Sequence, residues 1–89
     1  MKTLVTNLQS SNGNPVPNQF QLTTDEGIFF QSYSSIIVKI DNKGQIFLDE
    51  KYWNYSKTTS KYRSIFLDET TKETQSKIDA GIYTLTNLN

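Results

Sequence analysis

The sequence predicts an α+β fold: a three- to four-stranded antiparallel sheet (a β-meander) with two short helices on one face and a C-terminal strand. Three observations support it. Residues 19–24 alternate polar and apolar side chains, as a half-buried strand does. Glycine-ended turns at 25–27 and 41–44 interrupt a region rich in Ile, Phe and Val. After residue 55 the apolar spacing becomes that of a helix.

The chain is expected to form one small domain, because 89 residues provide a single modest core. Within residues 1–89 we expect an N-terminal strand and loop arm over 1–18, the β-meander over 19–49, a helical segment over 55–80 and a C-terminal strand over 82–88.

The arm begins with a short strand over residues 2–8. We expect a loop over residues 10–18, because nearly every residue there favours turns, and Pro15 and Pro17 lack the N–H that regular structure uses.

The meander is expected to have three strands. Residues 28–40 are predicted to form one long strand, or one with a bulge near Ser34 and Ser35, and residues 45–48 the return strand.

The helical segment contains two predicted helices. The first places Tyr62, Ile65 and Phe66 on one face, at spacings of three and four. The second begins with Thr70 and Glu73, which have the spacing of a capping box.

The last strand follows Gly81, which is suited to the left-handed conformation that ends a helix. TLVTNL near the start resembles TLTNL near the end, so we also considered pairing of the two terminal strands.

Composition limits the chemistry. Nine Lys and Arg balance nine Asp and Glu, without the basic excess of typical nucleic-acid binders. The chain has no Cys and no His, which removes disulfides, thiol chemistry, the usual zinc ligands and the usual acid–base group at neutral pH. We expect no enzyme, no cofactor and no metal. Without an apolar stretch resembling a signal peptide or membrane span, we expect an intracellular protein without a membrane partner.

Two acidic features have simpler structural explanations. Aligning the turn at 41–44 with a calcium-binding loop puts Lys39 and Lys43 at ligand positions, so we interpret it as a hairpin. The acidic pairs at 49–50 and 68–69 could hydrolyse glycosides only across a cleft. We interpret them as solvated charge at the ends of elements, the second pair lying just before a helix.

Residues 55–64, YSKTTSKYRS, are the main candidate site. A helix cap needs only one hydroxyl, from Ser56, Thr58 or Thr59. The others, beside three cations, would suit a phosphate or a protein partner. The candidate binding residues are Tyr55, Ser56, Lys57, Thr58, Thr59, Lys61 and Arg63.

Aromatic residues form a second candidate surface. Phe29 and Phe30 must point to opposite faces of their strand, so one belongs to the core and the other is covered by a helix or exposed. The segment KYWNYS could cover the edge of the core or bind a partner. The possible aromatic interface consists of Tyr52, Trp53, Phe30 and Tyr33.

Two segments carry a family resemblance. Ser32, Tyr33, Ser35 and Ile37 match S-Y-x-[ST]-x-I, and residues 55–61 match Y-S-x-T-T-S-K, with a D-N-x-G-type turn between them. The pattern resembles one that recurs in small bacteriophage-encoded proteins of unknown function. A histidine often expected near residues 61–63 is missing here, so no imidazole role is carried over. The resemblance implies a phage or mobile-element product acting in a bacterial cytoplasm.

The sequence therefore favours a non-enzymatic accessory protein that binds and inhibits or diverts a host protein, such as an anti-CRISPR-like or other anti-defence inhibitor. The alternative is a small nucleic-acid-binding module using the YSKTTSKYR segment. A third class, a virion or assembly component, would self-associate.

Overall fold

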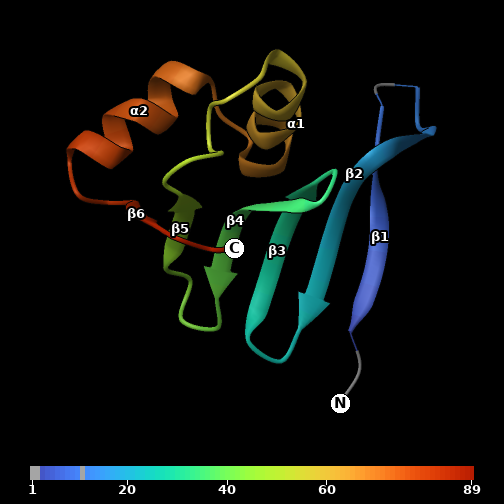
Figure 1. Ribbon diagram of the computed structural model, residues 1–89, viewed down its shortest axis with the longest axis horizontal. Coiled ribbons are helices and arrows are strands. Elements are labelled where there is room, and N and C mark those ends of the chain that lie inside the picture. The colour runs from blue at the N-terminus through green and yellow to red at the C-terminus, as the bar shows by residue number, and fades with distance from the viewer. Residues whose placement is uncertain (1–2, 11) are drawn as a thin grey trace.

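The structure is a computed structural model that describes residues 3–10 and 12–89, and it has an α+β fold (Figure 1). Its elements are β1 (Leu4–Gln9), β2 (Pro15–Thr24), β3 (Gly27–Ser32), β4 (Ser35–Asp41), β5 (Ile46–Asp49), α1 (Lys57–Leu67), α2 (Thr71–Asp79) and β6 (Thr84–Thr86). Lys2, predicted in the first strand, and Ser11, predicted in the following loop, lie outside the described residues.

The sheet is larger than predicted, and it is mixed. Within the described residues its six strands lie in chain order, with every neighbouring pair antiparallel except β5 and β6, which are parallel. Both helices lie between β5 and β6 in the sequence, so this segment is long enough for the crossover that a parallel pair requires. The predicted number of strands, three or four, was too small. The terminal strands β1 and β6 lie at opposite edges and do not pair (Figure 1).

The predicted loop over residues 10–18 ends early, because β2 begins at Pro15. This part of β2 extends past β3, whose pairing starts only at Gln19, so it has β1 as its one neighbour. Proline is tolerated in a strand where its missing N–H faces no partner. The two prolines therefore do not prevent the strand.

The predicted long strand over residues 28–40 is in fact two strands. Ser32 pairs with Ser35 across a tight turn, in which Tyr33 has a φ of 56°. The Tyr33 amide donates a hydrogen bond of 2.7 Å to the Asn18 carbonyl, which holds this turn against β2. A register shift does occur opposite Phe30, but it lies within β4 rather than at the turn.

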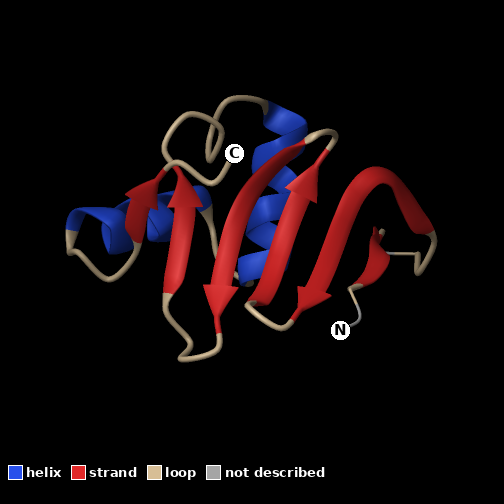
Figure 2. Cartoon of the chain, turned by 60° about the horizontal axis from the view of Figure 1, so that its bottom comes forward, coloured by secondary structure: helices blue, strands red, loops and turns tan. Residues whose placement is uncertain are grey.

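The core lies between the sheet and the helices, which both lie on one side of the sheet in Figure 2. Its buried hydrophobic residues are Phe30, Ile37, Val38, Leu48 and Tyr83. The Phe66 ring of α1 stacks on Phe30 with a centroid distance of 5.6 Å.

The inner face of α1 differs from the predicted one. Tyr62 and Phe66 pack against the core as expected, but Ile65 is 49% exposed. Thr59 and Arg63, both fully buried, complete that face. The buried positions therefore follow the spacing 59, 62, 63 and 66, which is shifted from the predicted stripe.

The start of α2 is confirmed as a capping box. Thr70 Oγ1 accepts a hydrogen bond from the Glu73 amide at 3.1 Å, and Glu73 Oε1 accepts one from the Thr70 amide at 2.9 Å. Gly81 follows the helix with a φ of 76°, as predicted. None of the helices in the described residues is long and apolar enough to cross a membrane.

Candidate functional site

The YSKTTSKYR segment leads into α1 and forms its first two turns. Ser56 is the N-cap: its backbone is extended, and its Oγ accepts a hydrogen bond from the Thr59 amide at 3.1 Å. Of the three hydroxyls considered for the cap, the structure uses Ser56. Thr58 is exposed.

The structure divides the seven candidate binding residues into two groups. Tyr55, Lys57, Thr58 and Lys61 are exposed, and Ser56 is half-buried. Thr59 is fully buried, and its Oγ1 shares a hydrogen bond of 2.8 Å with Ser32 Oγ of β3. Arg63 is also fully buried. The last two therefore pack inside the protein instead of joining a surface for a partner or phosphate.

The Arg63 guanidinium links α1 to the segment before it and to the start of α2. It donates to the Trp53 carbonyl before α1 and, at 2.6 Å, to Thr71 Oγ1 at the start of α2. It also lies 5.1 Å from the centroid of the Trp53 ring. Burial lowers the pKa of Arg63 below its ordinary value, and the nearby Glu69 charge partly offsets this. The residue acts as a structural connector.

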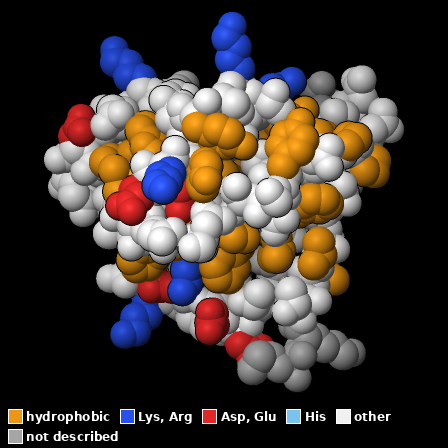
Figure 3. Space-filling model, in the orientation of Figure 1, with side chains coloured by type: hydrophobic (Ala, Val, Ile, Leu, Met, Phe, Trp, Pro, Cys, Tyr) orange, Lys and Arg blue, Asp and Glu red, His pale blue; other side chains and the backbone are white. Residues whose placement is uncertain are grey.

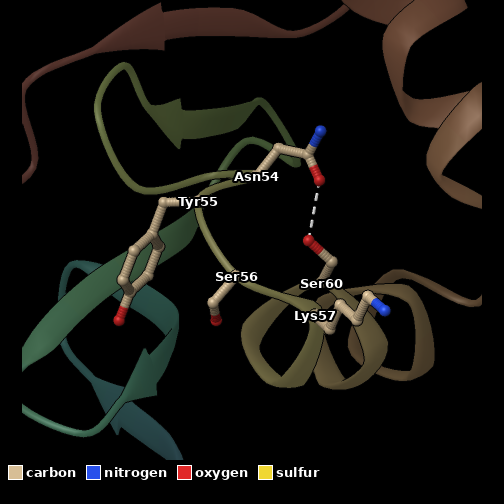
Figure 4. A pocket seen from close by; sticks show the side chains of 5 residues that line it. All are labelled: Asn54, Tyr55, Ser56, Lys57 and Ser60. Carbon is tan, nitrogen blue, oxygen red and sulfur yellow. Dashed lines mark hydrogen bonds between the residues drawn. The ribbon is translucent and has the colours of Figure 1, made fainter.

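An open hollow of about 340 Å³ lies at the N-terminus of α1 (Figure 4). Its lining residues are Asn54, Tyr55, Ser56, Lys57 and Ser60. Figure 4 shows the Tyr55 ring on one side and Ser60 with Lys57 on the other, and Ser60 Oγ donates a hydrogen bond of 2.7 Å to Asn54 Oδ1. The hollow combines one cation with hydroxyl and amide groups.

The four predicted interface aromatics do not form one surface. Phe30 is fully buried in the core and is not available to a partner. Tyr33 is 52% exposed, in the turn between β3 and β4. Trp53 is half-buried against the core, and Tyr52 makes an edge-to-face contact with Tyr55 at a centroid distance of 5.2 Å. Tyr33 and the Tyr52–Tyr55 pair are the accessible parts.

Sequence reasoning missed the role of Glu69, whose side chain is only 3% exposed rather than solvated. It accepts hydrogen bonds from Lys77 Nζ at 2.6 Å, Thr74 Oγ1 at 2.8 Å and the Tyr83 hydroxyl at 3.0 Å. Burial alone would raise the pKa of Glu69, but these hydrogen bonds outweigh it and hold the pKa below its ordinary value. The Glu69 carboxylate therefore connects α2 to the core residue Tyr83.

Asp49 is likewise buried rather than solvated. Its Oδ1 accepts hydrogen bonds from the Leu88 amide at 2.8 Å and from Asn89 Nδ2 at 3.0 Å. Burial opposes ionisation of Asp49, but these bonds and those from two further amides keep its pKa below the ordinary value. Its carboxylate fixes the end of the chain to the sheet.

The sheet face turned away from the helices is a further candidate surface. Its central row runs across neighbouring strands as Val5, Leu22, Phe29, Lys39 and Phe47, which are paired in register. The adjoining row pairs Phe30, Val38 and Leu48, which are buried under the helices, so the central row points the other way. With the half-buried Phe20 and Ile36, this row makes up what we call the open sheet face.

The signal for this surface was present in the sequence, because Phe29 and Phe30 must point in opposite directions. Phe29 is the half-buried residue of the pair, and Lys39 Nζ lies 5.6 Å from the centroid of its ring. The open sheet face therefore carries the second aromatic that the sequence could not assign.

The chain was compared with protein families, curated proteins and solved structures. A model described as "Family of unknown function (DUF8033)" matches residues 3–81. No curated protein and no solved structure matches the chain. Within residues 3–10 and 12–89, no group of three or more His, Cys, Asp and Glu side chains could hold a metal ion.

Proposed function

The chain belongs to the DUF8033 family of unknown function, and we propose that it is a non-enzymatic phage or mobile-element accessory protein that binds a host protein. In this proposal it acts in the bacterial cytoplasm, where it inhibits or diverts its target. CRISPR-type and other defence effectors are the candidate targets. The observation that supports binding is the open sheet face.

Several features of the open sheet face suit a protein partner. Its central row is apolar and aromatic except for Lys39, and it crosses five strands. Apolar surface left on one side of a sheet is costly in water, and contiguous patches of this kind mark interaction sites. Phe29 and Phe47 are the type of side chain that protein interfaces favour at their centre.

The inhibitory role rests on the resemblance to small bacteriophage-encoded proteins. Small phage proteins commonly act by occupying a host factor, and a binding surface is all that such a role requires of the fold. The proposal assigns no reaction to the chain.

The test is affinity capture from a lysate of the bacterium that carries the gene, at physiological salt, with mass spectrometry. We expect one host protein to be enriched by the natural chain and lost with Phe29→Ser and with Val5→Lys. The second variant keeps the apolar core intact, because Val5 is 54% exposed. Ile65→Ser, at an exposed position of α1, is the matched control and should retain the partner.

The proposal fails if no specific partner is enriched, or if both open-face variants, shown to be folded by circular dichroism, retain it fully. If the chain inhibits its partner, the purified partner should be active alone and should lose activity when the chain is added.

Nucleic-acid binding remains the second candidate, and the hollow at the start of α1 is the observation that favours it. A helix N-terminus beside Lys57 suits phosphate, and the exposed Tyr55 could stack on a base. Two observations weaken it. Arg63 is buried, and in Figure 3 the Lys and Arg side chains described on that face are scattered rather than gathered into one patch.

A mobility-shift titration at several salt concentrations tests this candidate. Binding should weaken steeply with salt and on the double change Lys57→Ala and Lys61→Ala, while Lys43→Ala in a distant turn serves as control. Undetectable binding at low salt would eliminate it.

A further inference from the structure

A trough of about 300 Å³ lies on the open sheet face near the turn between β2 and β3. Its apolar floor comes from three strands: Leu22 of β2, Phe29 of β3 and Ile36 of β4. Thr24, Asp25 and Glu26 form the end of the trough at the turn. It therefore joins an apolar surface to a pair of carboxylates.

The acidic end is held in a fixed backbone conformation. Thr24 Oγ1 accepts a hydrogen bond from the Glu26 amide at 3.0 Å and donates one to the Gly27 carbonyl at 3.2 Å. Asn42 Nδ2 in the neighbouring turn donates to the Asp25 carbonyl. These hydrogen bonds hold the backbone that carries the Asp25 and Glu26 side chains in one conformation.

The two carboxylates have no partner of their own in the described part of the chain. Asp25 and Glu26 are exposed, and neither carboxylate makes a hydrogen bond or an ion pair with another described residue. Both side chains are exposed, so a cation of a partner can reach them.

One positive charge, that of Lys39, lies over the apolar floor, and Lys43 belongs to the turn next to the acidic end. Lys39 Nζ is placed over the Phe29 ring, 5.6 Å from its centroid. A partner's cation would be repelled beside Lys39 and attracted beside Asp25 and Glu26. A bound segment that carries an apolar side chain next to a cation would therefore lie with its cation toward Asp25 and Glu26 and its apolar side chain toward the floor.

We propose that the trough binds a segment of a partner protein in which an apolar side chain stands next to a lysine or arginine. The apolar side chain lies over Leu22, Phe29 and Ile36, and the cation pairs with Asp25 and Glu26. This inference rests on the binding function proposed above and names the chemistry of the contact. The charge complementarity of the acidic turn selects this occupant over a neutral or acidic segment.

The test is a titration of the ¹⁵N-labelled full chain followed by NMR. The probes are three blocked peptides: acetyl-Gly-Leu-Arg-Gly-amide, acetyl-Gly-Leu-Glu-Gly-amide and acetyl-Gly-Ser-Arg-Gly-amide. At millimolar concentrations, only the Leu-Arg peptide should shift the amide signals of the trough residues strongly. The Leu-Glu peptide should bind about three-fold or more weaker, as expected for the loss of one exposed ion pair.

A charge-removing variant gives the internal control. The double change Asp25→Asn and Glu26→Gln lies in an exposed turn and leaves the apolar floor unchanged, so the fold should be retained. It should abolish the preference for Leu-Arg over Leu-Glu. Lys61→Gln, at an exposed position of α1 on the other side of the sheet, should leave that preference intact.

The inference is overturned if no peptide shifts the trough signals, if Leu-Arg and Leu-Glu bind equally, or if the preference survives removal of both carboxylates. The broader function is judged separately. A host protein captured by the natural chain with no peptide preference in the trough would overturn this inference alone. A clear peptide preference with no captured host protein would overturn the proposed target class alone.

Discussion

Replacing Arg63 with alanine should destabilise the protein by about 3 kcal/mol rather than weaken a binding site. Its guanidinium is fully buried and donates to the Trp53 carbonyl and to Thr71 Oγ1. No ion pair of Arg63 with a carboxylate occurs among the described residues. The residue thus connects the segment before α1 to the start of α2 through hydrogen bonds.

The magnitude combines three contributions. Removing the two methylenes beyond Cβ, at Cγ and Cδ, costs roughly 1.6 kcal/mol at about 0.8 kcal/mol each. Leaving the Trp53 carbonyl and Thr71 hydroxyl without their donor costs roughly 2–3 kcal/mol. Releasing a buried cation that lacks a carboxylate partner returns roughly 1–2 kcal/mol. The net loss is about 3 kcal/mol, equivalent to a fall in Tm of roughly 12–24 °C for a domain of this size.

Urea and thermal unfolding followed by circular dichroism measure this loss. Lys61→Ala is the matched control, because Lys61 is an exposed cation on the same helix and should change stability by less than about 0.5 kcal/mol. Arg63→Met keeps the apolar stem and should lose less than alanine does. A loss below about 1 kcal/mol for Arg63→Ala, or an equal loss for Lys61→Ala, would refute the structural role.

Three further predictions concern single positions. Gly27→Ala should cost at least roughly 3 kcal/mol in chemical unfolding, because the new Cβ would lie 2.1 Å from a backbone oxygen of β4 at a φ of 136°. Gly44→Ala, with open space around it, should cost only about 1 kcal/mol, and equal losses would contradict the explanation. The pKa of Glu69 is lower in the folded than in the unfolded protein, so the ionised carboxylate stabilises the fold fully above its ordinary pKa of 4.5, and this stabilisation is lost as the pH falls through the folded pKa. As the pH is lowered from 4.5, the urea midpoint should therefore fall more for the natural chain than for Glu69→Gln, and parallel curves would disprove this. Ser56→Ala should cost about 1 kcal/mol of stability and Thr58→Ala almost nothing, and the reverse order would show that the cap is misassigned.

The parts of the fold that the sequence predicted well have strong local signals. The turns at 25–27 and 41–44 end in glycines with positive φ, and the capping box at Thr70 and Glu73 closes as its spacing indicates. The turn at Tyr33 was missed, because it has no glycine or proline and its positive φ is supported by a hydrogen bond to another strand. Such support depends on tertiary structure.

The candidate site was likewise predicted only where the signal is local in sequence. The polar residues around the start of α1 were visible, but which of them are buried depends on the rotation of the helix about its axis. A shift of one position places Arg63 inside and Ile65 outside, against their hydropathy. The acidic turn at Asp25 and Glu26 was interpreted only as a turn. Its position at the end of an apolar trough follows from the pairing of β2, β3 and β4, which no local pattern specifies.

The parallel pairing of β6 with β5 has a consequence for the order of folding. The first five strands follow one another through short turns, so each hairpin closes between residues near in sequence, a fast process. Asp49 and Thr86 pair across the segment that contains both helices, so their contact closes a much longer loop. We therefore expect the pairing of β6 to be the last step in the assembly of the sheet, which pulse-labelled amide exchange during refolding would show as late protection of β6.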